Sequence, residues 1–165
     1  MLAYLSGSIE NSPDGGRAWR AALKPFLAET LRHEVYDPAE ATPQLVGAET
    51  YESFRAWKTS DPDRFRATVR RIIAHDLEVL TSRASYVICN WDEHVVKGGG
   101  TQGELTVAFN RSIPIYLVTH LPLENISGWI LGCAELILPN FSELRRFLQK
   151  KYGEPRLDLK EFSSK

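Results

Sequence analysis

Short apolar runs alternate with segments of helical periodicity along most of the chain. The runs predict five strands, at residues 2–6, 33–36, 85–90, 113–118 and 135–138. Apolar spacings of three and four residues predict helices at about 17–31, 61–82, 101–110 and 142–151. Strands that alternate with helices are typical of parallel sheets with right-handed crossovers. We therefore expect an α/β fold with a doubly wound, five-stranded parallel sheet of flavodoxin or Rossmann type, in the strand order 2-1-3-4-5.

Residues 39–62 lack a clear period and are predicted to form a long excursion with one short helix. The segment contains Tyr51, Phe54 and Trp57. Aromatic side chains outside any core period predict that some of the three cover a pocket or contact a partner subunit. We expect a single domain over residues 1–152 that includes this excursion, followed by a polar tail at 153–165.

Composition and charge narrow the classes of partner. The 165 residues carry 20 Lys and Arg against 21 Asp and Glu, a net charge of −1. The chain therefore lacks the excess of basic residues that would predict binding to nucleic acid or to an anionic membrane. No apolar stretch approaches the ~20 residues of a membrane span. The chain opens almost directly on a strand, so we expect no secretory signal and a cytoplasmic location. Cys89 and Cys133 are too few for a disulfide framework or a zinc site, and Cys89 is expected to be buried.

Asp76 interrupts the apolar face of the predicted helix at 61–82. It lies three or four residues from Ile72, Ile73 and Leu80, so its side chain is expected to point toward the core or a crevice. A buried carboxylate must be paired, hydrogen-bonded or protonated. Two interpretations stay open: a structural Asp that ties down a neighbouring element, or a residue with a catalytic or ligand-binding role.

A glycine-rich loop precedes the predicted helix at 101–110. The glycines at 98, 100 and 103 have the spacing of a dinucleotide fingerprint, but residues 91–97 separate them from the preceding strand and no acidic residue ends the next one. We therefore expect no nicotinamide, no flavin and no other cofactor or metal. Glycines at a helix N-terminus allow the backbone to approach a ligand, which makes Gly99, Gly100 and Thr101 candidate binding residues.

Glu104 admits two interpretations. Thr101 and Glu104 have the spacing of a capping box, in which the Glu accepts the N–H of the cap residue. Alternatively, the helix dipole keeps Glu104 ionised beside the glycine loop, where it acts as a nucleophile while a second, protonated carboxyl acts as the general acid.

Polar residues follow the first and third predicted strands. Ser6, Gly7 and Ser8 end the first strand, and Asn90 and Asp92 follow the third. In doubly wound sheets, ligands bind beyond the carboxyl ends of the strands at this switch point. These residues are therefore expected to meet in one crevice, where the serines reach a sugar or a phosphate.

The order and spacing of these pieces resemble the nucleoside 2-deoxyribosyltransferase family and the related deoxynucleoside-monophosphate N-glycosidases. The resemblance extends from Leu2 to about Leu148 and is carried by four short stretches, at residues 4–9, 73–77, 85–92 and 99–105. It implies a doubly wound enzyme that cleaves or transfers at the N-glycosidic bond of a 2′-deoxynucleoside. A small-molecule nucleoside or nucleotide is the implied partner, and we expect a homo-oligomer.

The resemblance also implies roles for individual residues. Glu104 corresponds to the nucleophile that attacks the anomeric carbon, and Asp76 to the Asp that assists at the base or the sugar. Tyr4 corresponds to the family's strand-one tyrosine, although from the residues alone it is either a core tether or an active-site donor. Asp92 is the nearest candidate for the Asp that the transferases place before the nucleophile, and the proton donor is Asp76 or Asp92.

A second class of function stays open. A protein of the same fold can bind or sense a nucleotide or nucleotide-sugar without catalysis, in which case Glu104 is only a cap and Asp76 only a hydroxyl acceptor. Glu10 follows Ile9 where the monophosphate glycosidases have a basic residue, so the presence of a 5′-phosphate pocket is also open.

Overall fold

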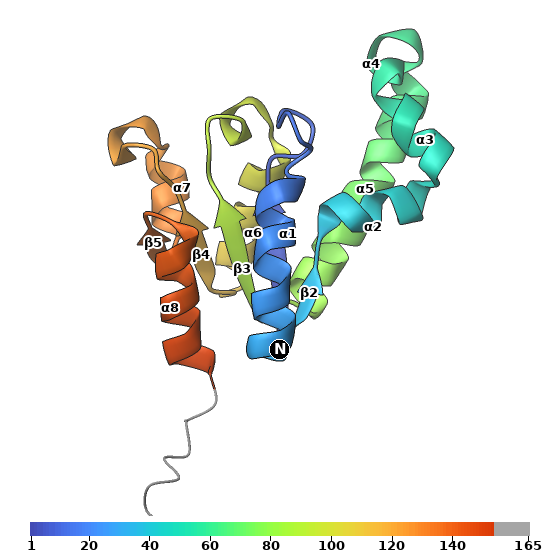
Figure 1. The fold of residues 1–165 in the computed structure, drawn as a ribbon. Coiled ribbons are helices and arrows are strands. Elements are labelled where there is room, and N and C mark those ends of the chain that lie inside the picture. The colour runs from blue at the N-terminus through green and yellow to red at the C-terminus, as the bar shows by residue number, and fades with distance from the viewer. Residues whose placement is uncertain (154–165) are drawn as a thin grey trace, which may run out of the picture.

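The architecture is an α/β fold built on a five-stranded, all-parallel sheet in the order β2-β1-β3-β4-β5, as predicted (Figure 1). The computed structural model describes residues 1–153, so the predicted tail lies outside the described residues except for Gly153. The strands are β1 Leu2–Gly7, β2 Glu34–Tyr36, β3 Tyr86–Asn90, β4 Ile115–Val118 and β5 Leu136–Leu138.

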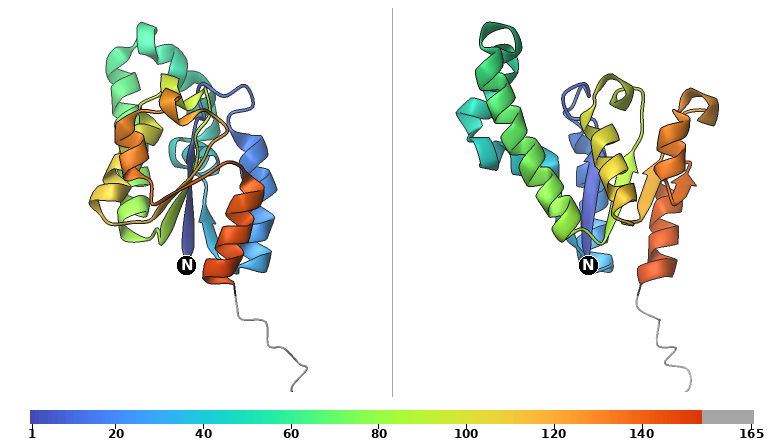
Figure 2. Two further views of the ribbon diagram at one scale, coloured as in Figure 1. Left: turned by 90° about the vertical axis from the view of Figure 1, so that its left-hand side faces the viewer. Right: turned by 180° about the vertical axis from the view of Figure 1, so that it is seen from behind.

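Helices cover both faces of the sheet (Figures 1 and 2). One face carries α1 (Arg17–Pro25) and α8 (Phe141–Tyr152). The other carries α5 (Pro62–Ser82), α6 (Gly100–Asn110) and α7 (Gly128–Cys133). This sandwich places the carboxyl ends of all five strands at one edge of the molecule.

The alternation of side chains along β1 divides the core into two clusters. Ala3 and Leu5 face α1 and α8, whereas Tyr4 faces α5 and α6. All six residues of β1 are buried, because a central strand of a doubly wound sheet is covered on both faces. Cys89 of β3 is also fully buried, as expected.

The helix predicted at 17–31 is divided. After α1 the chain continues as a single π-helical turn, Phe26–Thr30, in which the Leu31 N–H donates to the Phe26 carbonyl at 3.2 Å. Pro25 at the junction has no N–H to donate, which weakens the α-helical ladder at this point.

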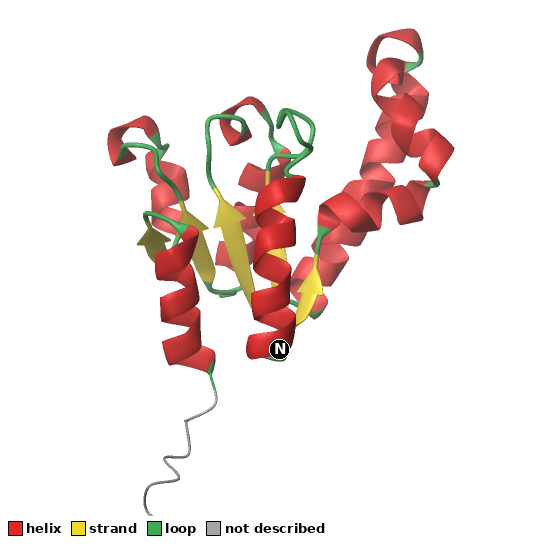
Figure 3. Ribbon diagram, in the orientation of Figure 1, coloured by secondary structure: helices red, strands yellow, loops and turns green. Residues whose placement is uncertain are grey.

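The excursion at 39–62 is helical almost throughout, so the expectation of one short helix is wrong. It contains α2 (Pro38–Val46), α3 (Ala48–Ser53), a 3₁₀ turn (Phe54–Ala56) and α4 (Trp57–Ser60). With the N-terminal half of α5 these helices form an arm that projects beyond the carboxyl edge of the sheet (Figure 3). Helices this short span too few turns to display a periodic pattern.

Local signals nevertheless mark the limits of these helices. Asp37 caps α2 by accepting the Ala39 N–H at 2.9 Å, and Gly47, with a φ of 86°, separates α2 from α3. Asp61 caps α5 by accepting the Arg64 N–H at 3.1 Å.

Outside the arm, three further short elements were not predicted. They are α7, capped by Ser127, and the 3₁₀ turns Val95–Lys97 and Leu123–Asn125. Within residues 1–153, no helix combines the length and the apolar character needed to cross a bilayer.

The β1–α1 loop contains two adjacent glycines that allow a matched test of its packing. Gly15 and Gly16 have φ values of 67° and 69°, so alanine is strained at either position, by roughly 1–2 kcal/mol. At Gly16 an added Cβ would also lie 2.3 Å from the Ser8 carbonyl oxygen, whereas at Gly15 its closest neighbour would be 3.9 Å away. Gly16→Ala is therefore expected to lower the free energy of unfolding by roughly 1–3 kcal/mol more than Gly15→Ala, as measured by urea denaturation. Equal losses would show that the loop tolerates the added methyl group.

Candidate functional site

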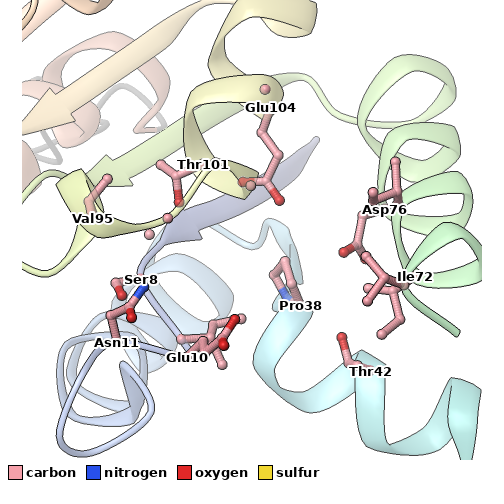
Figure 4. A pocket seen from close by; sticks show the side chains of 18 of the residues that line it. Ser8, Glu10, Asn11, Pro38, Thr42, Ile72, Asp76, Val95, Thr101 and Glu104 are labelled. Carbon is pink, nitrogen blue, oxygen red and sulfur yellow. The ribbon is translucent and has the colours of Figure 1, made fainter. Parts of the chain in front are cut away.

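A cavity of about 540 Å³ lies at the carboxyl edge of the sheet, between the body of the molecule and the arm (Figure 4). Its walls are the β1–α1 loop, the glycine loop with the first turns of α6, the start of α2, and the facing sides of α3 and α5. Its size falls within the roughly 300–1,000 Å³ of small-molecule sites. Most of the lining is apolar, and three acidic residues belong to it. Glu104 and Asp76 extend into the cavity from different helices, whereas Glu10 lies on the β1–α1 loop and pairs with Lys58.

Glu104 is held by two hydroxyl groups of β1. Tyr4 Oη donates to Glu104 Oε1 at 3.0 Å, and Ser6 Oγ donates to Oε2. The capping-box interpretation is wrong, because α6 begins at Gly100 after a Gly99 cap and the described contacts of the carboxylate are with side chains. Tyr4 and Ser6 are absent from the cavity lining. Their hydroxyl groups therefore contact the Glu104 carboxylate rather than the space in which a ligand would bind.

Asp76 is held by a tyrosine of the neighbouring strand. Tyr36 Oη donates to Asp76 Oδ1 at 2.6 Å. The parallel register pairs Tyr4 of β1 with Tyr36 of β2, and their rings stack with centroids 5.2 Å apart. Two stacked tyrosines therefore present two hydroxyls, one to Glu104 and the other to Asp76.

Burial dominates the electrostatics of Glu104. It raises the pKa of the carboxyl above its ordinary value, and the negative charge of Asp76 adds to this rise. The hydrogen bonds from Ser6 and Tyr4 and the positive charge of Arg20 act in the opposite direction. Hydroxyl donors, rather than the helix dipole alone, therefore favour the ionised form of Glu104.

Asp76 has fewer interactions that favour its charged form. Burial raises the pKa of its carboxyl, and only the Tyr36 hydrogen bond and the charge of His75 oppose this rise. Because Oδ1 accepts the hydrogen bond from the Tyr36 hydroxyl, a proton carried by Asp76 belongs on Oδ2. The site thus contains two hydroxyl-bound carboxyl groups in different environments, the arrangement that separates an acid from a nucleophile.

Five of the candidate binding residues line the cavity. Gly7 and Ser8 line one wall, and Gly99, Gly100 and Thr101 line the wall at the start of α6. Thr101 and Ser8 are each only 8% exposed, which leaves little more than the cavity face of either side chain accessible.

Asp92 and Asn90 are not brought into the lining. Asp92 Oδ1 accepts the backbone N–H groups of His94 and Val95, at 3.0 and 3.2 Å, and Oδ2 accepts Asn90 Nδ2 at 3.0 Å. Asp92 thus folds back to organise the turn after β3. The expectation that both residues share the cavity with Glu104 does not agree with this placement, and we do not retain Asp92 as a proton donor.

The arm contributes aromatic rings to the cavity, which confirms part of the expectation for residues 39–62. Tyr51 and Phe54 line it together with Arg55, whose guanidinium lies over both rings, 5.0 and 4.7 Å from their centroids. Trp57 is not in the lining and stacks instead with the guanidinium of Arg64. Contact of this segment with a partner subunit remains a prediction.

Three residues at or beside the cavity were not predicted from the sequence: Tyr36, Thr42 and Pro38. Thr42 and Pro38 belong to α2, which was not predicted, and both line the cavity. Tyr36 was recognisable in principle, since it ends the strand expected to pair with the strand of Tyr4. Over residues 1–153 no group of three or more His, Cys, Asp or Glu side chains is placed to hold a metal ion.

The raised pKa of Asp76 predicts how stability depends on pH. A carboxyl group whose pKa is higher in the folded state makes its largest contribution to the free energy of unfolding below its unfolded pKa, about 3.9. This contribution is lost as the pH rises through the folded pKa. Asp76→Asn cannot titrate and still offers an Oδ1 acceptor to Tyr36. Its free energy of unfolding, relative to that of the wild type, is therefore expected to increase from pH 4 to pH 7 in urea denaturation. The control Glu78→Gln removes an exposed carboxylate from the same helix. A difference between Asp76→Asn and wild type that does not change with pH would contradict the prediction.

Comparison with known proteins identifies the fold. No family model matches the sequence, and no curated protein matches it. Among solved structures, the chain is similar to a 2-deoxyribosyltransferase from the psychrotolerant bacterium Bacillus psychrosaccharolyticus, described as a biocatalyst for the synthesis of antiviral and antitumoral nucleosides. The TM-score is 0.66 and the identity 17%, over 95% of this chain and 100% of that one. At this identity, the similarity establishes a shared five-stranded α/β fold.

Proposed function

We propose that the protein cleaves or transfers at the N-glycosidic bond of a 2′-deoxynucleoside, with Glu104 as nucleophile and Asp76 as general acid. The observation that carries the proposal is the pair of carboxyl groups in one cavity, Glu104 held by two hydroxyl donors and Asp76 by one. The fold shared with a 2-deoxyribosyltransferase supports the same class of reaction.

Glu104 has the environment that a carboxylate nucleophile needs. Tyr4 and Ser6 orient it and stabilise its charge, while its exposed part faces the cavity. Its oxygen forms a bond to C1′ as the bond from C1′ to the base nitrogen breaks, and the electron pair of that bond goes to the base. The negative charge of Glu104 also stabilises the oxocarbenium-like transition state.

Asp76 supplies the proton that the departing base requires. Burial favours its protonated form, and the Tyr36 hydrogen bond leaves Oδ2 to carry the proton. In the second step a water molecule or another base attacks C1′ and regenerates the Glu104 carboxylate. Asp76 then takes back a proton from the attacking group, since the same residue serves as acid and base in the two steps.

The apolar part of the cavity suits a heterocyclic base. Tyr51 and Phe54 offer ring faces, and Ile72, Ile73 and Leu77 of α5 extend the apolar wall toward Asp76. Ring faces bind bases by stacking, with roughly 1–3 kcal/mol per base. This arrangement favours a base on the side of the arm, next to the general acid.

Glu104→Gln tests the nucleophile. The amide keeps the size of the side chain and one acceptor oxygen but has no negative charge to attack C1′. Base release from 2′-deoxynucleosides is expected to fall by at least about 10³-fold, as in other losses of a covalent catalyst, with a melting temperature close to that of the wild type. Chromatography of the free base and a melting curve on the same sample measure the two effects.

Glu78→Gln is the matched control, because it removes a carboxylate from the exposed side of α5. Full activity of Glu104→Gln would exclude the mechanism. A wild type inactive on every deoxynucleoside and monophosphate, yet able to bind one of them, would instead support the non-catalytic binding protein.

Transfer and hydrolysis are separated by adding a second free base to the reaction. Transfer yields the exchanged nucleoside and consumes the second base. Hydrolysis yields free deoxyribose, and the second base does not change the rate at which this product forms. The glycosyl-enzyme mechanism permits both outcomes, and the ratio of the two products measures which acceptor the cavity admits.

A further inference from the structure

Arg20 is a buried cation next to the cavity that the proposed chemistry does not yet use. Its side chain, from α1, is only 1% exposed, and its guanidinium lies 4.5 Å from the ring centroid of Trp19. Burying a guanidinium is costly unless its N–H groups and its charge are satisfied. The groups that satisfy it therefore indicate what the residue does.

Three backbone carbonyls from the two ends of the β1–α1 loop accept its N–H groups. Nη1 donates to the Gly16 carbonyl at 2.8 Å and to the Ser8 carbonyl at 3.5 Å, and Nη2 donates to the Gly7 carbonyl at 3.1 Å. The loop between these carbonyls carries four consecutive lining residues, Ser8 to Asn11. The guanidinium thus joins the two ends of the loop that forms one wall of the cavity.

The same side chain reaches the opposite wall through Asp37. Arg20 Nε lies 3.2 Å from Asp37 Oδ1, and Asp37 is the residue that caps α2. Pro38 and Thr42 of α2 line the cavity. Lys24 also contacts Asp37, at 2.5 Å, but it is partly exposed and pairs with Glu40 instead of the loop.

We propose that Arg20 is a positioning residue for the reaction proposed above: it fixes the β1–α1 loop and the start of α2 relative to each other and places a buried positive charge near Glu104. The groups that act on this carboxylate are the hydroxyls of Ser6 and Tyr4 from β1, the charge of Asp76 from α5 and the charge of Arg20 from α1. Among these, Asp76 raises the pKa of Glu104, and Arg20 lowers it. Glu104 in turn raises the pKa of Tyr36 of β2 and of Cys89 of β3.

Arginine suits this role for a geometric reason. Its planar group offers five N–H donors in a fixed fork, so one side chain reaches three carbonyls and a carboxylate at once. Lysine in the same place would keep the charge but reach fewer of the partners. The two substitutions, lysine and glutamine, therefore separate the loss of geometry from the loss of charge.

The test compares Arg20→Lys, Arg20→Gln and the control Lys24→Gln with the wild type. Base release is measured against pH, and the Glu104 carboxyl is titrated by ¹³C NMR in substrate-free protein, with Glu104→Gln identifying its signal. We expect kcat of both Arg20 variants to fall roughly 10- to 100-fold, because the β1–α1 loop and α2 no longer hold the cavity walls in place. Only Arg20→Gln should move the Glu104 midpoint, and with it the acid limb of the rate profile, to higher pH. Lys24→Gln should stay within about two-fold of wild type in kcat, with an unchanged midpoint, since it leaves the loop contacts intact.

A folded Arg20→Gln with the wild-type Glu104 midpoint and wild-type kcat would overturn the proposal, and so would a Lys24→Gln that reproduces the effects of Arg20→Gln. If Arg20→Gln does not fold, Arg20→Lys decides: unchanged kcat and KM would overturn the proposal, and a fall in kcat at an unchanged Glu104 midpoint would support it. Absence of base release by the wild type would refute the proposed function instead. The NMR titration still tests Arg20 in that case, because it requires no substrate.

Discussion

The burial of two carboxyl groups in one largely apolar cavity is the constraint that the rest of the site accommodates. A carboxylate removed from water is unfavourable unless donors replace its hydration, and a second carboxylate nearby increases the cost. Glu104 receives two hydroxyl donors and the influence of the buried Arg20, whereas Asp76 receives one donor and the influence of His75. Burial raises the pKa of both carboxyl groups, and the proposed mechanism depends on this difference in donors to keep Glu104 ionised while Asp76 carries the proton.

The parallel sheet supplies the donors with the right spacing. Tyr4 and Tyr36 are partners in the register of β1 and β2, so their side chains leave the sheet on the same face and stack. Ser6 lies two residues after Tyr4 and therefore on the same face of β1. Glu104 on α6 and Asp76 on α5 come from the helices that cover this face, so a single layer of packing brings donors and acceptors together.

The sheet, the loops and the arm contribute different properties. The sheet and the helices packed on it hold Glu104 and Asp76, the β1–α1 and glycine loops supply polar backbone, and the arm supplies apolar and aromatic surface. Arg20 couples the first loop to the root of the arm through Asp37. The similarity to a 2-deoxyribosyltransferase covers nearly the whole chain at 17% identity, which means that the fold is shared while most side chains differ.

The sequence by itself determined the strand order and the main helices, because apolar periodicity and the right-handed crossover leave few alternatives for a βαβ chain. It also singled out Asp76 and Glu104, since an acidic residue on an apolar helix face or after a glycine loop conflicts with its surroundings. The helices of the arm, the inward turn of Asp92 and the contacts of Tyr36 and Arg20 were decided only in the tertiary structure. Each depends on partners distant in sequence: Arg20 and Asp37 are 17 positions apart, Tyr36 and Asp76 are 40, and Tyr4 and Glu104 are 100. A local pattern shows that a buried charge needs a partner, but only the packed chain determines which group becomes that partner.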